Sequence, residues 1–192
     1  MKMSLDDYLQ GDAILPMFVE KCIVYIEENG LGSEGLYRVP GNKAHVELLL
    51  QKFNEDHTLV FTDLEISVND VATAVKTFFR ELQEPLIPNK LNNEFISAAG
   101  IHDKTRRLQA LREVLQKLPA GNYRVLKFIA THLNKVTTLS DVNCMTSTNL
   151  AICWWPTLLR PEFASLTDMA SSAGSLQAVV QTIIDHHGFF FE

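Results

Sequence analysis

The fold is decided by residues 122–136, which read NYRVLKFIATHLNKV. Val125, Leu126, Ile129 and Leu133 recur there at the intervals that place side chains on one face of an α-helix. Further apolar residues widen that face, and a helix that is apolar around most of its circumference is buried. We therefore expect a helix over residues 122–136 at the centre of a helical bundle.

Segments on both sides of this stretch repeat the helical spacing, whereas the alternation typical of strands is weak. The first helix is expected over residues 15–29, with Pro16 in its first turn and Gly30 as its stop. The other helices are expected after a cap at Asn42, over residues 69–82, after Pro88, from Asp103, from Thr146 or Ser147, and around residues 176–184.

These segments predict an all-α fold, a single-domain bundle of about eight helices over residues 14–192. Residues 1–13 are left without an assigned role. No internal repeat and no shift in composition after residue 13 indicates a second domain. Pro156 lies within the helix that opens at Thr146 or Ser147, and its missing N–H should end or kink that helix around Trp155.

Composition excludes several classes of function. A net charge of -6 and a pI near 5.5 argue against a nucleic-acid binder, which needs a basic surface. The three cysteines contain no C-x-x-C pair and lie among apolar neighbours, which indicates free thiols in a reducing compartment. The first residues lack the order of a signal peptide, and the apolar runs are far shorter than the roughly 20 residues that cross a bilayer. We expect a cytoplasmic protein without a transmembrane segment.

Residues 30–35 read GLGSEG and match the dinucleotide-binding pattern G-x-G-x-x-G. That pattern binds a pyrophosphate only where it follows a strand and opens a helix. Here a helix precedes it, and Pro40-Gly41 prevents a helix from following at once. The segment is interpreted as a helix stop followed by a turn-rich loop.

Arg38 stands in the middle of that loop, between Gly35 and Pro40, and the sequence alone leaves two readings open. It is either an ordinary surface arginine or a charge that a constrained backbone presents to a partner.

Residues 69–82 carry a second basic feature. Val71, Val75 and Phe78 define one buried stripe of the expected helix, and Lys76 and Arg80 lie nearly opposite it. Like charges four positions apart repel each other mildly. The pair is either a solvated basic face or a binding feature.

Motifs of common enzymes are missing: there is no H-E-x-x-H, no P-loop, no G-x-S-x-G and no metal-spaced set of Cys and His. We therefore expect no metal site. His132 lies on the central helix, where it is interpreted as a satisfied core histidine, and His186-His187 as an exposed pair.

Three motifs carry a resemblance to a known family. They are EGLYRVPGN at residues 34–42, KTFFRELQEPL at 76–86 and NCMTSTNLA at 143–151. In this order and spacing the sequence resembles a RhoGAP domain, over almost the whole chain from Ile14. WPTLLRP at 155–161 and FFF at 189–191 are most similar to the glucocorticoid receptor DNA-binding factor group of long Rho GTPase-activating proteins.

The resemblance implies a GTPase activator that is not itself an enzyme. Arg38 takes the position of a catalytic arginine finger, and Lys76, Arg80, Asn149 and Pro156 take positions that contact the partner or support the finger. The implied partner is a Rho-family small GTPase in its GTP-bound form, Rho first, then Rac or Cdc42. The domain itself needs no cofactor, because GTP and magnesium belong to the GTPase, and it acts at membranes where the GTPase is anchored. The alternative is a module that binds the GTPase without accelerating hydrolysis.

Overall fold

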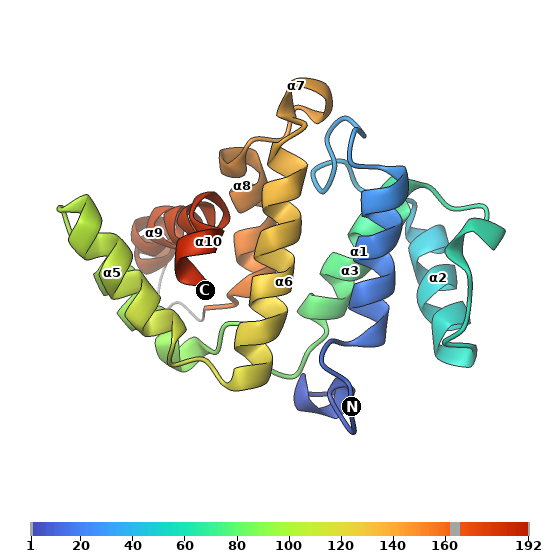
Figure 1. The fold of residues 1–192 in the computed structure, drawn as a ribbon, viewed down its shortest axis with the longest axis horizontal. Coiled ribbons are helices and arrows are strands. Elements are labelled where there is room, and N and C mark those ends of the chain that lie inside the picture. Colours follow the sequence, from blue (N-terminus) through green and yellow to red (C-terminus); the bar gives the residue numbers. More distant parts are fainter. Residues whose placement is uncertain (1, 162–165, 192) are drawn as a thin grey trace.

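The computed structural model describes residues 2–161 and 166–191, and their regular structure is helical throughout (Figure 1). The longer helices are α1 (Met17–Asn29), α2 (Lys43–Glu55), α3 (Val68–Arg80), α4 (Asn92–Ala99), α5 (Lys104–Leu115), α6 (Ala120–Thr137), α8 (Ser147–Leu158) and α9 (Leu166–Asp185). The shorter elements are α7 (Ser140–Asn143), α10 (His187–Phe190) and 3-10 turns at Asp6–Tyr8, Phe61–Asp63 and Asn89–Leu91. The expected all-α bundle of about eight helices is confirmed.

Several helices begin where a polar side chain can bond a free backbone N–H. The Asn42 side chain accepts from the N–H of His45 at the start of α2, and Thr146 accepts from that of Asn149 at the start of α8. At the start of α3, Ser67 and Asp70 form a reciprocal capping box. Each such cap contributes about 1 kcal/mol, so these local signals fix the helix starts.

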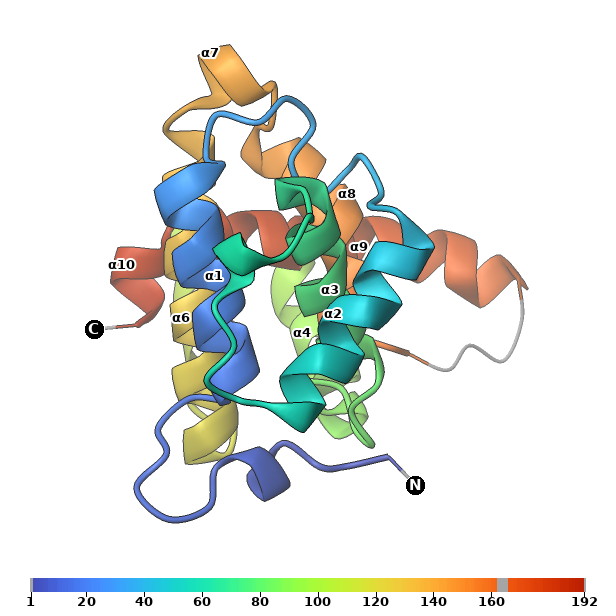
Figure 2. The same ribbon diagram turned by 90° about the vertical axis from the view of Figure 1, so that its right-hand side faces the viewer.

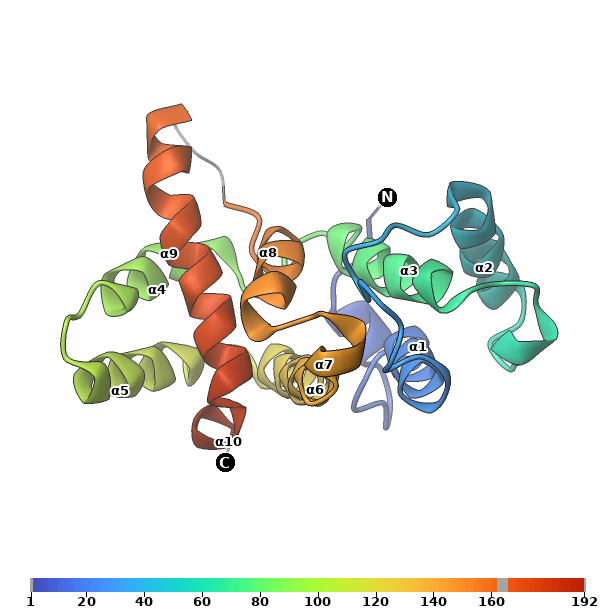
Figure 3. The ribbon, with the colours of Figure 1, turned by 90° about the horizontal axis from the view of Figure 1, so that it is seen from above.

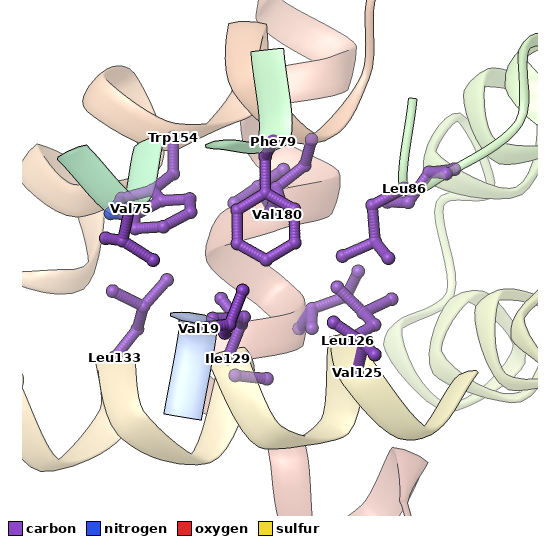
Figure 4. Close-up of a cluster of buried hydrophobic side chains, with 14 of the residues drawn as sticks. Val19, Val75, Phe79, Leu86, Val125, Leu126, Ile129, Leu133, Trp154 and Val180 are labelled. Carbon is purple, nitrogen blue, oxygen red and sulfur yellow. The ribbon is translucent and has the colours of Figure 1, made fainter. Parts of the chain in front are cut away.

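The helix α6 lies at the centre, as expected. Seen from above, α1, α2 and α3 lie on one side of α6 and α8, and α4 and α5 lie on the other (Figure 3). The α6 side chains meet residues of α1, α3, α8 and α9 (Figure 4). The side chains shared by this core are at most 1 % exposed: Val19, Val75, Phe79, Val125, Leu126, Ile129, Leu133, Trp154 and Val180. Burial of a Val, Leu, Ile or Phe side chain contributes about 1.5–3 kcal/mol, so this contact region makes a large contribution to stability.

The expectation that Pro156 ends its helix around Trp155 is wrong, because α8 continues to Leu158; the other expectation, a kink at this point, stays a prediction. A proline removes the N–H that would bond to the carbonyl four positions earlier, here that of Ile152, and its ring crowds that carbonyl. Ile152 is 51 % exposed, so water can reach this part of the helix. The N–H of Leu159 then bonds to the carbonyl of Trp155 at 3.0 Å and closes the last turn.

The cysteines differ from one another in exposure. Cys22 is buried and Cys153 is half-buried, but Cys144 is exposed, which corrects the expectation that all three lie among apolar neighbours. Cys144 follows α7 in the left-handed conformation, with φ 63°. The turn directs the chain toward α8, and the thiol remains outside the core.

Residues 2–13 pack against the bundle, below α1 and α6 (Figure 2). Leu5 is buried, and the ring of Tyr8 lies edge-on to Phe78 with centroids 4.8 Å apart. The N–H of Gln83 donates to the carbonyl of Met3 at 2.8 Å. Within residues 2–161 and 166–191, no helix is both long enough and apolar enough to span a membrane.

Candidate functional site

The Arg38 loop, residues 30–42, joins α1 to α2 and is shaped by a tight turn. Gly35 and Tyr37 both have φ 73°, in the left-handed region. The carbonyl of Gly35 accepts from the N–H of Arg38 at 2.8 Å and from that of Val39 at 2.9 Å. A side chain at Gly35 would lie 2.6 Å from Cγ2 of Val39, so the turn requires glycine. Arg38 is exposed at this turn.

The first half of the loop is fixed by Asn143, which is fully buried. The N–H of Gly35 donates to the backbone carbonyl of Asn143 at 2.8 Å. The Asn143 side chain donates to the carbonyl of Leu31 at 2.8 Å and to that of Val136, in α6, at 2.9 Å. One asparagine thus ties the loop to the central helix. Asn143 opens the third motif, but its place in the sequence does not reveal this role.

The second half of the loop is fixed by Asp70, which is 2 % exposed. Its carboxylate accepts from the N–H of Asn42 at 2.7 Å, from that of Ser67 at 2.9 Å and from Nδ1 of His45 at 3.0 Å. Burial alone would raise the pKa of Asp70, but the hydrogen bonds from Ser67, Asn42 and His45 outweigh it, so this pKa lies below its usual value. The ionised carboxylate therefore holds the end of the loop against α3.

Gly41 lies directly against α3 next to this carboxylate. Its N–H donates to the hydroxyl of Thr73 at 2.8 Å. A Cβ at Gly41 would lie 2.6 Å from the Cα of Asp70. The close contact between the loop and the helix therefore requires glycine at this position.

Lys76 contacts the middle of the loop. Its Nζ donates to the carbonyl of Tyr37 at 3.2 Å, one residue before Arg38. Burial lowers the pKa of Lys76; the Cys153 thiol acts against this effect, and the neighbouring Arg80 adds to it. Lys76 does not lie on a solvated face opposite the core, because α3 packs against α1, α2 and α8 and leaves Lys76 half-buried beside the loop.

Arg80 lies one turn beyond Lys76 on α3 and is exposed, as its position opposite the buried stripe predicts. Its Nε donates to the hydroxyl of Thr157 at 3.3 Å. Thr157 is buried and follows Pro156 on α8. The contact therefore places the guanidinium of Arg80 next to the end of α8.

Asn149 and Pro156 lie on one face of α8, since they are seven positions apart, with Cys153 between them. Asn149 Nδ2 donates to the carbonyl of Cys144 at 3.0 Å. In the described part of the chain its Oδ1 has no hydrogen bond, so this oxygen can accept one from a partner. Pro156 and Ile152 add exposed apolar surface.

The loop, α3 and α8 bring the predicted residues to one surface. Burial raises the pKa of Cys153, while the positive charges of Lys76 and Arg38 act in the opposite direction, which places both cations near this α8 face. The surface therefore gathers cationic groups on a chain whose net charge is -6. Such a surface suits an anionic group, and the bidentate donors of arginine match a phosphate. Over the described ranges, no cluster of three or more His, Cys, Asp or Glu could hold a metal ion.

Known proteins resemble this chain over most of its length. A family model described as "RhoGAP domain" matches residues 16–163. Rho GTPase-activating protein 35 of Mus musculus is 45 % identical over 177 residues, which cover 92 % of this chain and 12 % of that protein. Rho GTPase-activating protein 190 of Drosophila melanogaster is 41 % identical over 195 residues, which cover 95 % of this chain and 12 % of that protein. The chain thus spans about an eighth of the length of these relatives.

Solved structures agree with these matches. The crystal structure of human Rho GTPase activating protein 15 superposes with a TM-score of 0.93 at 31 % identity, covering 99 % of this chain and 90 % of that one. The BH domain from GRAF, the GTPase regulator associated with focal adhesion kinase, gives a TM-score of 0.85 at 29 % identity, covering 94 % and 96 %. The resemblance read from the three sequence motifs is confirmed, including its similarity to the group that contains Rho GTPase-activating protein 35.

Proposed function

Because the chain belongs to the RhoGAP family, we propose that it activates GTP hydrolysis by a Rho-family small GTPase and supplies Arg38 to the active site of that partner. The observation that carries this proposal is the combination of an exposed Arg38 with a loop that buried groups hold at both ends. A mobile surface arginine would need no such anchoring. A side chain that must meet a reacting group benefits from it, because preorganised donors stabilise a transition state without reorganisation.

Arginine suits this task chemically. Hydrolysis of GTP develops charge on phosphate oxygens, and a guanidinium offers them a planar fork of donors that stays charged at any physiological pH. In the Ras system an arginine supplied by an activator raises the rate by roughly 10³–10⁵. The GTPase supplies the nucleotide, the magnesium ion and the group that orients water, so the activating domain needs no cofactor of its own.

The remaining residues of the surface serve docking and support. Lys76 holds the carbonyl next to Arg38, and Arg80 and Pro156 border the same face. The free Oδ1 of Asn149 accepts a hydrogen bond from the GTPase. This surface binds the GTP-bound form, at the membrane where the GTPase is anchored, with Rho preferred over Rac or Cdc42.

Single-turnover GTP hydrolysis tests the function directly. Purified Rho-like, Rac-like, Cdc42-like and Ras-like GTPases are loaded with GTP and mixed with increasing amounts of the chain. We expect acceleration for at least one Rho-family member and none for Ras. Binding to the GTP-analogue form without acceleration of any member would instead identify a non-catalytic binding module.

A further inference from the structure

A continuous path of polar side chains runs from the surface of α6 to the residue before Arg38. Lys135 Nζ lies 2.9 Å from Glu27 Oε1, and Glu27 Oε2 lies 2.8 Å from His132 Nδ1. His132 Nε2 lies 2.6 Å from the hydroxyl oxygen of Tyr37. His132 is 1 % exposed and Tyr37 3 %. The Glu27 side chain is only 24 % exposed, because it is turned toward the histidine.

The hydrogen bonds along this path have one consistent direction. The hydrogen bond from His132 is the main cause that lowers the pKa of Glu27, to about 2, so this carboxylate can only accept. The proton on His132 therefore sits on Nδ1. Burial lowers the pKa of His132, which keeps the ring neutral and leaves Nε2 with a lone pair. Tyr37, whose pKa burial raises, is then the donor to Nε2.

The backbone of Tyr37 needs such a restraint. Its φ of 73° lies in the left-handed region, which costs a residue with a side chain about 1–2 kcal/mol. Conformations of this kind persist only where the surroundings determine them. The ring packs edge-on to Trp154 at 5.1 Å and to His132 at 5.7 Å. Tyr37 is thus held at three points: its ring packs against Trp154 and His132, its hydroxyl bonds to His132, and its carbonyl accepts from Lys76. Because Tyr37 directly precedes Arg38, its conformation sets the direction of Arg38.

We propose that Tyr37, His132 and Glu27 are positioning residues, which hold the Arg38 loop in the one conformation that presents Arg38 to the GTPase. The inference rests on the proposed function of Arg38. His132 and Tyr37 are buried, and the side-chain hydrogen bonds of the three residues join them to one another and to Lys135, so their part in the reaction is indirect. They act on the reaction only through the backbone of the loop.

Tyr37→Phe tests the hydrogen bond to His132 alone, since it keeps the ring and removes one hydroxyl. In single-turnover hydrolysis at increasing domain concentration, the plateau rate should fall about tenfold while the half-saturating concentration changes less than about twofold. Val179→Ala, a buried change in α9 away from the loop, provides a control with a comparable loss of melting temperature. An equal loss of plateau rate in this control would show that the hydroxyl acts through stability alone and would overturn the proposal.

Two substitutions of His132 test whether a replacement hydrogen-bond acceptor restores part of the plateau rate. His132→Gln places an amide oxygen that can accept from the Tyr37 hydroxyl, whereas His132→Leu offers no acceptor. The glutamine variant should retain several times more of the plateau rate than the leucine variant. Equal rates for the two variants would contradict a role for the hydrogen bond.

A measurement on the isolated chain separates this inference from the proposed function. Backbone order parameters of residues 35–41, measured by NMR, should fall in Tyr37→Phe and remain at the parent values in Val179→Ala. Unchanged order in Tyr37→Phe would overturn the inference whatever the activity. If the parent accelerates no Rho-family GTPase, the proposed function fails, and loosening of the loop in Tyr37→Phe still supports the positioning role.

Discussion

Arg38→Ala should separate catalysis from binding. Arg38 is exposed, and among the described residues its side chain makes no hydrogen bond or ion pair, so truncation should change the free energy of unfolding by less than about 0.5 kcal/mol. The loop keeps its conformation, because its anchors are Asn143, Asp70 and Lys76. Any loss of activity therefore reports on the guanidinium itself.

The expected loss follows from where the guanidinium acts. Removing one preorganised donor from a developing charge costs roughly a hundredfold to a thousandfold in rate, about 2.7–4 kcal/mol of transition-state stabilisation. The ground-state complex should lose less, because an interaction made mainly in the transition state adds little to ground-state affinity. We expect the GTP-analogue form of the GTPase to bind within roughly tenfold of the parent affinity.

Two assays measure the separation. Single-turnover hydrolysis gives the stimulated rate, and titration with the GTP-analogue form gives the affinity. A complex with the GDP form plus aluminium fluoride, which stands in for the transferring phosphoryl group, should depend far more on Arg38 than the analogue complex does. Arg38→Lys is the matched control: it keeps the charge but lacks the bidentate fork, so it should recover little of the rate.

Either of two results would refute this reasoning. Near-parent stimulation by Arg38→Ala would show that the guanidinium is not the catalytic group. Equal losses in analogue affinity and in rate would show that Arg38 contributes only to docking. In both cases a non-catalytic binding module would explain the chain better.

Five further predictions concern the residues around Arg38 and those that support its loop. Lys76→Met should lower the plateau rate by about tenfold, through loss of a charge-assisted hydrogen bond to the loop, with a small shift of melting temperature. Asn149→Ala should raise the half-saturating concentration by about threefold to tenfold; an unchanged value would limit this residue to the start of α8. Asp70→Ala leaves two backbone N–H groups without their acceptor and should lower the free energy of unfolding by about 2–4 kcal/mol, measured by urea denaturation. From pH 7 to pH 5 the melting temperature should fall, because burial lowers the folded-state pKa of His132, so that the unfolded chain binds the extra proton; His132→Gln should show a shallower slope. Below about pH 5 a further loss should follow down to about pH 2, since the Glu27 pKa is lowered from 4.5 to about 2 and its stabilising contribution requires the ionised form.

The helices could be predicted from the sequence because their signals are local. Asn42 caps α2 as its position before an apolar periodic segment predicts, and the central place of α6 follows from its wide apolar face. The helix end predicted near Pro156 was wrong, because the spacing of apolar residues does not show how exposed this turn of α8 is. A missing N–H matters less near the end of a helix, where an exposed turn allows water to satisfy the free carbonyl.

The anchors of the Arg38 loop were harder to find. Glu27 and His132 are 105 positions apart, and Tyr37 and His132 are 95 apart, so no spacing rule connects them. Asp70 had a readable signal, since Ser67 stands three positions before it in the arrangement of a capping box. That signal predicts the start of a helix, but it does not reveal that the same carboxylate also accepts from Asn42 at the end of the loop.

Arg38 lies on a loop, and the residues that hold this loop lie in the helical bundle, so the proposed catalytic group and the groups that position it are separate. A left-handed residue lets neighbouring side chains diverge, so Tyr37 turns into the core while Arg38 stays in solvent. The polar groups that hold the loop are buried and charged or hydrogen-bonded, and removing one partner of such a pair leaves the other unsatisfied. Substitutions at the buried anchors Asn143 and Asp70 should therefore lower stability and rate together, whereas those at Arg38 should lower the rate alone. A variant series that plots rate against melting temperature should consequently resolve two classes, and a variant of Asn143 or Asp70 that keeps full stability but loses the rate would place that residue at the reacting groups instead.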